Sequence, residues 1–154
     1  MHMHLPMHVT AATDAEIPLL CELLHELFSQ ESEFTPDAVK QRCGLERIMA
    51  NPAIGTILVA RDNEVVVGMV SLLFTESTAL GARVALLEDM VVRPAARGRG
   101  IGTMLLQAAF QAARAEGCRR ITLLTDATNT AAQRFYARHG FGASPMIPLR
   151  LNLD

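Results

Sequence analysis

The densest group of residues with a chemical use is a segment rich in glycine and arginine, residues 97–102 (Arg-Gly-Arg-Gly-Ile-Gly), here called the glycine loop. It follows an apolar run and opens a helical pattern. The first amides of a helix have no partner inside the helix and lie at the positive end of its dipole, so they attract anions. Glycine removes side chains that would hold a diphosphate away, and arginine adds charge and N–H donors. The segment therefore predicts a phosphate site.

Two common phosphate-binding loops do not fit this segment. The dinucleotide pattern requires a glycine three residues after its second one, and that position holds Thr103. The ATP-type loop requires Gly-Lys followed by Ser or Thr, and no lysine is present here. Both alternatives are rejected, and a plain nucleotide binder is left as the weakest function class.

Two motifs together resemble a known family. Arg97-x-x-Gly100-x-Gly102 after a strand resembles the Arg/Gln-x-x-Gly-x-Gly/Ala signature of the GNAT N-acetyltransferase superfamily, and residues 129–141 resemble that family's second motif. The resemblance implies an enzyme that moves the acetyl group of acetyl-CoA to a primary amine of a small molecule or peptide. It implies direct attack in a ternary complex, with no metal. The alternative is a non-catalytic acyl-CoA binding or sensing module.

The resemblance also implies how acetyl-CoA is held. The diphosphate would rest on the loop amides, and the pantetheine arm would pair with the preceding strand as if adding a strand. Such pairing needs a splayed sheet, because a strand paired on both sides has no free amides. A backbone amide near Val91 would polarise the thioester carbonyl, and Asn129 would bind the arm from the opposite side. The implied contacts are Met90, Val91, Val92, Arg97, Gly98, Arg99, Gly100, Ile101, Gly102, Thr103 and Asn129.

Tyr136 is the only tyrosine in the chain and falls where the family places its general acid. An alkylammonium acceptor with a pKa near ~10.4 must lose its proton, and a thiolate must leave. A phenol, at about 10, is a weaker acid than a thiol, at about 8.5, so protonating a free thiolate in water is uphill by roughly 2 kcal/mol. The competing interpretation is a core tyrosine on the helix face of Ala132 and His139. The place of Tyr136 in the motif favours the role of general acid.

Glu88 is the candidate general base, acting through a water. Its spacing to the glycine loop resembles that of the strand glutamate in the polyamine-acetyltransferase branch. The histone-type branch places its glutamate two residues earlier, where this chain has Leu86. Asp89 is the rival, because neighbouring strand side chains point to opposite faces and a bulge would exchange the two. A solvated or ion-paired carboxylate is the other interpretation of Glu88.

An acidic patch formed by Glu26, Glu31 and Glu33 lies at the end of the first helical pattern. The family commonly places its acceptor groove nearby, so a cationic amine acceptor is one hypothesis and a solvated surface patch is the other. A histidine cluster at the N-terminus has no accompanying carboxylate or cysteine, so no metal site is expected there. Its members are His2, His4 and His8.

Hydrophobic spacing predicts the elements that must position these groups. The predicted strands are 7–11, 54–60, 65–74, 83–92, 121–125 and 146–153, and the predicted helices are 14–30, about 35–51, 101–116 and 129–139. Pro18 is expected to delay regular bonding in the first helix, and Gly44 to interrupt the second. This order and the resemblance predict an α/β (α+β) GNAT fold. Its mixed, mostly antiparallel sheet would have about six to seven strands, splay at the fourth, and be flanked by about four helices.

Length and composition set the remaining expectations. The 154 residues suit one domain, 1–154, and a net charge of -2 predicts no attraction to nucleic acid or an anionic membrane. The longest apolar stretch, Val65–Phe74, is too short to span a membrane, and residues 1–8 lack the features of a secretory signal. Three widely spaced cysteines are typical of a cytoplasmic protein. A homodimer is compatible with the family, although no pattern fixes an interface.

Overall fold

A computed structural model describes residues 6–30 and 35–154. The chain divides into two compact units, Met1–Leu124 and Thr125–Asp154. The first unit contains the sheet and three α-helices, and the second contains helix α4 (Thr130–Arg138) and the C-terminal segment.

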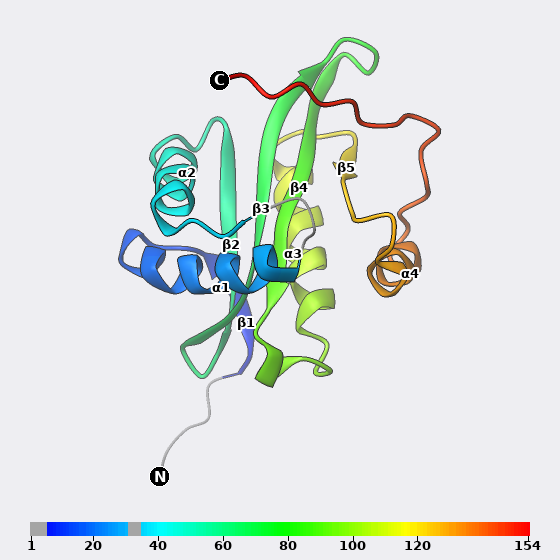
Figure 1. The fold of residues 1–154 in the computed structure, drawn as a ribbon. Coiled ribbons are helices and arrows are strands. Elements are labelled where there is room, and N and C mark those ends of the chain that lie inside the picture. The colour runs from blue at the N-terminus through cyan, green and yellow to red at the C-terminus, as the bar shows by residue number, and fades with distance from the viewer. Residues whose placement is uncertain (1–5, 31–34) are drawn as a thin grey trace. The chain divides into compact units, whose positions relative to one another are not determined.

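The first unit is built on a sheet whose described strands lie side by side in chain order (Figure 1). The strands are β1 (His8–Ala11), β2 (Gly55–Asp62), β3 (Val65–Ser77), β4 (Ala82–Val92) and β5 (Ile121–Leu123). Neighbours from β1 to β4 run antiparallel, whereas β5 runs parallel to β4. The predicted mixed, mostly antiparallel sheet is thus confirmed. The described residues give it five strands, fewer than the six to seven expected.

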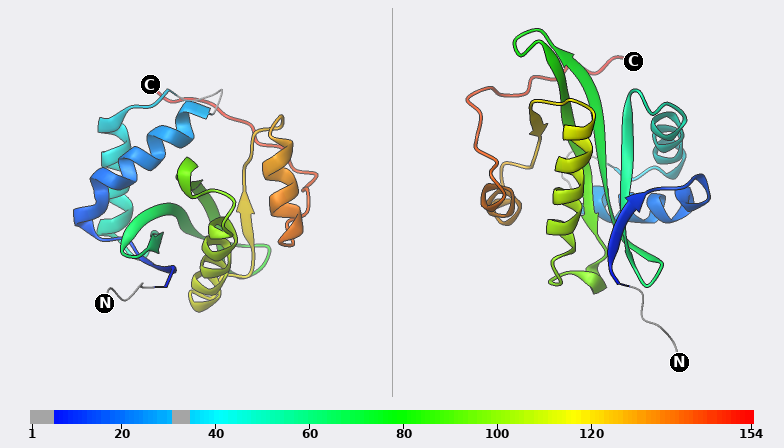
Figure 2. Two further views of the ribbon diagram at one scale, coloured as in Figure 1. Left: turned by 90° about the horizontal axis from the view of Figure 1, so that it is seen from below. Right: turned by 180° about the vertical axis from the view of Figure 1, so that it is seen from behind.

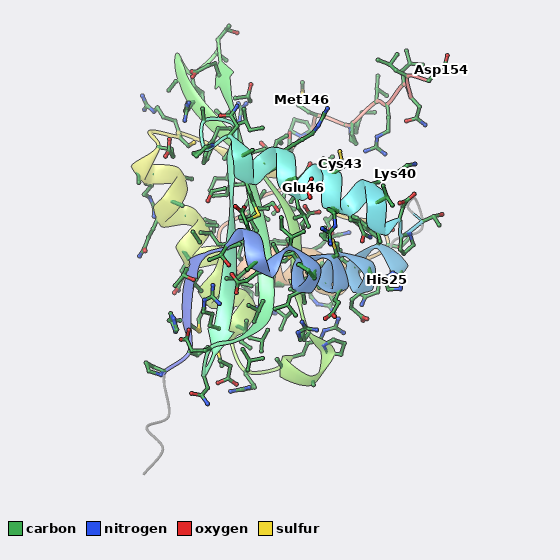
Figure 3. The ribbon with its side chains drawn as sticks, turned by 90° about the vertical axis from the view of Figure 1, so that its left-hand side faces the viewer. His25, Lys40, Cys43, Glu46, Met146 and Asp154 are labelled. Atoms are coloured by element: carbon green, nitrogen blue, oxygen red, sulfur yellow. The ribbon has the colours of Figure 1, made fainter. Side chains whose placement is uncertain are left out.

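Helices cover the sheet on two faces, as Figure 2 shows. Helices α1 (Ile17–Gln30) and α2 (Ala38–Ala50) pack on one face, and α3 (Ile101–Ala115) packs on the other. Gly68 of β3 allows α3 to lie close, because a Cβ there would stand 3.1 Å from Leu105 Cδ1. On the first face the buried core contains Ile17, Leu20, Leu23, Leu24, Leu45, Ile57, Val59, Val66, Met69 and Val91. The outer sides of α1 and α2 carry His25, Lys40, Cys43 and Glu46, all exposed (Figure 3).

A partly buried ion pair joins the start of α1 to the sheet. The chain enters α1 through a 3-10 turn, Asp14–Glu16, so regular α-helical bonding begins late, as Pro18 predicts. Glu16 Oε1 accepts from Thr13 N at 2.9 Å and from Arg61 Nη2 at 2.8 Å, and Arg61 Nε donates to Thr10 Oγ1 at 2.9 Å. The hydrogen-bonded guanidinium lowers the pKa of the Glu16 carboxyl. These contacts hold β1, β2 and α1 together.

The predicted interruption of the second helix at Gly44 is wrong. Helix α2 runs through Gly44 without a break and begins at an Asp37 cap, whose Oδ1 accepts from Val39 N at 3.0 Å and Lys40 N at 3.1 Å. Glycine inside a helix costs only about 1 kcal/mol relative to alanine. Burial of Leu45 in the core is worth more than that, so tertiary packing overrides the local preference.

The predicted C-terminal strand at 146–153 is also wrong. The segment has no regular secondary structure, although its apolar side chains alternate as a strand's would. Ile147, Leu149, Leu151 and Leu153 are 77–90% exposed. A strand exists only when a neighbouring strand takes its N–H and C=O groups, and Thr125–Asp154 contains no strand to do so. Within the second unit, the alternating segment therefore has no strand to pair with.

Candidate active site

The glycine loop connects the end of β4 directly to the N-terminus of α3. After Val92 a single 3-10 turn, Pro94–Ala96, leads into the loop, and α3 begins at Ile101. Gly98 and Gly100 have φ values of 80° and 79°, in the left-handed region that favours glycine. Both glycines are therefore required by the backbone path, in addition to clearing space for a ligand.

The amides at the start of α3 are available to an anion. Met104 N donates to Gly100 O at 3.1 Å, and the amides of Ile101 and Gly102, in the first turn, have no intrahelical acceptor. Gly100, which precedes the helix, has no side chain to cap them. A Cβ added at Gly98 or Gly100 would meet no atom within 4 Å, so the loop is open on that side. This geometry fits the diphosphate site that the sequence predicts.

Both arginines of the glycine loop are paired with carboxylates from other elements. Arg97 Nη2 lies 3.8 Å from Glu26 Oε1 of α1, and Arg97 Nε donates to Val92 O at 3.2 Å. Arg99 Nη1 donates to Asp62 Oδ2, at the end of β2, at 2.8 Å. Asp62 lies too far along the chain for any local pattern to reveal, so the sequence gives no sign that Arg99 is ion-paired.

The edge of β4 that faces β5 opens beside the loop. Along that edge β4 pairs with β5 only at Ala85–Leu87, whereas its other edge pairs with β3 as far as Val92. Residues 88–92 therefore have one open edge, which is the predicted splay. Arg93 N donates to Val67 O of β3 at 2.8 Å. Because strand backbone groups alternate in direction, those of Val92 face the open edge, in agreement with the contact from Arg97.

A bulge in β4 begins at Asp89, directly after Glu88, at the point where β4 and β5 separate. Ser71 pairs with Glu88 and Met69 with Val91, so Asp89 and the next residue together oppose a single residue of β3. Asp89 has a φ of 52°, a left-handed conformation that aspartate tolerates better than most residues. The Asp89 Oδ2 atom accepts from the hydroxyl of fully buried Ser71 at 3.2 Å. Glu88, just past the last β5 pair, has an exposed side chain.

The second unit contains the other two predicted site residues, Asn129 and Tyr136. Asn129 caps α4, where its Oδ1 accepts from Ala132 N at 3.0 Å, so its side-chain NH₂ group is the part that could donate to a ligand. The Tyr136 ring lies with its centroid 5.3 Å from that of Phe135 and 5.6 Å from that of Phe141. Burial raises the pKa of Tyr136 to about 12. The phenol therefore stays protonated at neutral pH.

Neither a metal site nor a membrane span is found in the described part of the chain. Within residues 6–30 and 35–154, no three His, Cys, Asp or Glu side chains gather closely enough to hold a metal ion. No described helix combines the length and the apolarity needed to cross a bilayer. His2 and His4 of the histidine cluster, and Glu31 and Glu33 of the acidic patch, lie outside the described residues.

Comparison with known proteins identifies the family. The model of the Acetyltransferase (GNAT) family matches residues 18–141. The chain belongs to the GNAT acetyltransferase family. A relative, the aminoalkylphosphonate N-acetyltransferase of Salmonella typhimurium, is 32% identical over 135 residues, which cover 88% of this chain and 82% of the relative.

Solved structures agree with this assignment of the GNAT fold. A putative acetyltransferase from Agrobacterium tumefaciens is 28% identical, with a TM-score of 0.77 over 93% of this chain and 99% of that one. An aminoglycoside N-acetyltransferase in complex with CoA is 18% identical, with a TM-score of 0.80 over 96% of this chain and 95% of that one, and shares the fold. This GNAT protein is thus an acetyl-CoA-dependent N-acetyltransferase, as the sequence predicts.

Sequence reasoning missed Ser71, although a signal was present. The residue is a lone hydroxyl inside the apolar run Val65–Phe74. A hydroxyl that is fully buried in a core strand requires a hydrogen-bond partner. That requirement pointed to a polar group on the neighbouring strand, and the structure supplies Asp89.

Proposed function

We propose that this GNAT enzyme transfers the acetyl group of acetyl-CoA to a primary amine of a small molecule or peptide, by direct attack in a ternary complex. The observation that carries the proposal is the fork after Leu87, where β4 leaves β5 and presents an open backbone edge next to the glycine loop. An extended arm can pair with that edge while its diphosphate rests at the N-terminus of α3. No other described strand has both features.

The proposed binding residues follow from this placement. The diphosphate lies on the amides of Arg97, Gly98, Arg99, Gly100, Ile101, Gly102 and Thr103, and the arm lies beside Met90, Val91 and Val92. Alternation along the strand favours the backbone groups of Met90 and Val92, rather than those of Val91, for direct bonds with the arm. A free amide there would also polarise the thioester carbonyl. The NH₂ group of Asn129 donates to the arm.

We assign the role of general base to Glu88 and the role of acid, donating to the leaving sulfur, to Tyr136. Glu88 is exposed at the fork, so a water can connect it to an entering ammonium. Asp89 already accepts a bond from buried Ser71, so it serves the bulge and is the weaker candidate for the base. Tyr136, protonated at neutral pH, donates to the leaving sulfur.

Direct attack, without an acetyl-enzyme, agrees with the protonated thiols expected for two of the three cysteines. Burial raises the pKa of the Cys21 and Cys118 thiols, which disfavours the thiolate that an acyl transfer to cysteine requires. Cys43 lies on the exposed side of α2. A direct mechanism predicts intersecting lines in two-substrate initial-rate plots. A ping-pong pattern, with acetylated protein detected by mass spectrometry, would contradict it.

The test of the function is a panel of amines assayed for release of free thiol from acetyl-CoA. The panel contains an aminoalkylphosphonate, because a relative with that activity is 32% identical, and also a polyamine, an amino acid, an aminoglycoside and a lysine peptide. We expect turnover with at least one of these primary amines and none with the matching N-acetylated compound. Tight CoA binding without acetylation of any amine would instead favour the non-catalytic acyl-CoA module.

A further inference from the structure

The two arginines of the glycine loop are held by carboxylates that come from separate parts of the first unit. Glu26 belongs to α1, and Asp62 lies at the end of β2. Glu26 Oε1 also accepts from Gln30 Nε2 at 3.0 Å, which fixes the carboxylate on the helix surface. Each loop arginine is thus neutralised by an acid that lies outside the loop.

A phosphate that binds either arginine must compete with these carboxylates. A guanidinium binds carboxylate and phosphate through the same fork of N–H donors, so the two anions cannot both use it fully. Arg97 is also turned back onto Val92 O, on the open edge of β4 where the arm is proposed to lie. Binding through Arg97 therefore requires its side chain to leave both Glu26 and Val92.

We propose that Glu26 and Asp62 compete with the phosphates of acetyl-CoA for Arg97 and Arg99, and so set the affinity for acetyl-CoA. The inference rests on the proposed function, in which the glycine loop holds the diphosphate. It adds two residues that weaken binding of acetyl-CoA by acting through the arginines, without touching the ligand themselves.

A third pair provides a matched control. Arg93, just before the loop, has its Nη2 3.3 Å from Glu22 Oε2, one turn before Glu26 on α1. Its Nε donates to Val66 O at 2.9 Å, which anchors the guanidinium to the sheet. Glu22→Gln removes the same charge from the same helix as Glu26→Gln, but frees no loop arginine. Comparing the two variants separates competition for Arg97 from the general effect of lowering the negative charge.

The experiment measures the Kd of CoA by titration calorimetry for the wild type and for E22Q, E26Q and D62N. Ion pairs at a protein surface contribute about 0.2–1 kcal/mol, so we expect E26Q and D62N to bind CoA about 1.4- to 5-fold more tightly than E22Q does. The gain should shrink at high salt, because these pairs are partly exposed and therefore screened. It should be absent with acetylpantetheine, which carries no phosphate. It should also disappear for E26Q in an R97Q background.

Two negative results have different meanings, because one contradicts the competition alone and the other contradicts the proposed function. If the wild type binds CoA and all three variants match each other, or if acetylpantetheine shows the same gain, the competition does not exist. If the wild type does not bind CoA, the proposed function itself fails and takes the inference with it. All three positions are on the surface, and circular dichroism confirms that each variant is folded before the titration.

Discussion

The raised pKa of Tyr136 can be measured directly, because the chain has one tyrosine and no tryptophan. The near-ultraviolet absorbance of tyrosinate therefore reports on this side chain alone. In the folded chain we expect the absorbance to rise with a midpoint at about 12. In the chain unfolded with denaturant, we expect the midpoint of a free phenol, near ~10.

The same shift makes stability depend on pH, and its sign follows from proton counting. Between the two midpoints the folded chain keeps a proton that the unfolded chain has lost. Stability therefore falls as pH rises, by about 1.4 kcal/mol per unit and by about 2.7 kcal/mol in all. Tyr136→Phe lacks the titrating group, so its urea unfolding free energy should fall less steeply over this alkaline range.

The shift also limits what Tyr136 can do in catalysis. Against a thiol of about 8.5, a phenol at about 12 makes full protonation of a free thiolate uphill by roughly 5 kcal/mol. We therefore expect Tyr136 to stabilise the leaving sulfur mainly as a hydrogen-bond donor. Bonds to charged groups contribute about 1.5–3 kcal/mol, so Tyr136→Phe should lower kcat about 10- to 100-fold with little change in the KM for acetyl-CoA.

Three results would refute this reasoning. A native titration midpoint near that of the unfolded chain would show that the phenol is not buried. An unchanged kcat in Tyr136→Phe would remove its role in the reaction. A decline of wild-type kcat near pH ~10 that Tyr136→Phe abolishes would show that the catalytic tyrosine ionises as a free phenol does.

Three further predictions concern the base, the loop and the α1 ion pair. Glu88→Gln should lower kcat/KM about 10²- to 10³-fold, because it removes the general base. Asp89→Asn keeps an acceptor for Ser71 and should lower kcat/KM less than about tenfold. The reverse ranking of the two variants would make Asp89 the base. Gly100→Ala forces a Cβ into a left-handed residue, at a cost of about 1–2 kcal/mol, so the free loop should relax to another conformation. Binding must then restore the left-handed turn, so calorimetry should show CoA affinity reduced about tenfold, and unchanged affinity would argue against this loop as the binding site. Glu16→Gln should lower the urea unfolding free energy by about 3 kcal/mol near neutral pH. Because the Glu16 pKa lies below its usual 4.5, that difference should vanish as pH falls through the folded pKa, and a difference that persists in strong acid would contradict the assignment.

Local features of the site could be predicted from the sequence, because their causes are local. The glycine loop needs only its own residues to turn left-handed at Gly98 and Gly100 and to expose helix amides. The end of β4 before Pro94 is determined within a few residues as well. The sequence therefore predicted the glycine loop and the start of α3 to within one turn.

Features that depend on partners distant in the chain were not predictable in this way. The pairing of Arg99 with Asp62 joins residues that approach only when the β2–β3 hairpin is folded. The bulge at Asp89 was considered as an option, but only the register with β3 shows it. The strand predicted at 146–153 is wrong because its local pattern is that of a strand, but the second unit contains no strand to pair with it.

The bulge at Asp89 reverses, within a single strand, which residues of β4 face each side of the sheet. In a regular strand Leu87 and Val91 would point the same way, yet pairing with Ser71 and Met69 gives Val91 the same face as Glu88. One extra residue thus lets β4 direct a carboxylate and, a few positions later, a core valine toward the same layer. Deleting Asp89 would leave a regular ladder and keep Val91 opposite Met69, on the same face as Glu88. Deleting a residue elsewhere in β4 would turn the residues on one side of the deletion to the other face. This strand should therefore tolerate a deletion at the bulge better than a deletion at any other position.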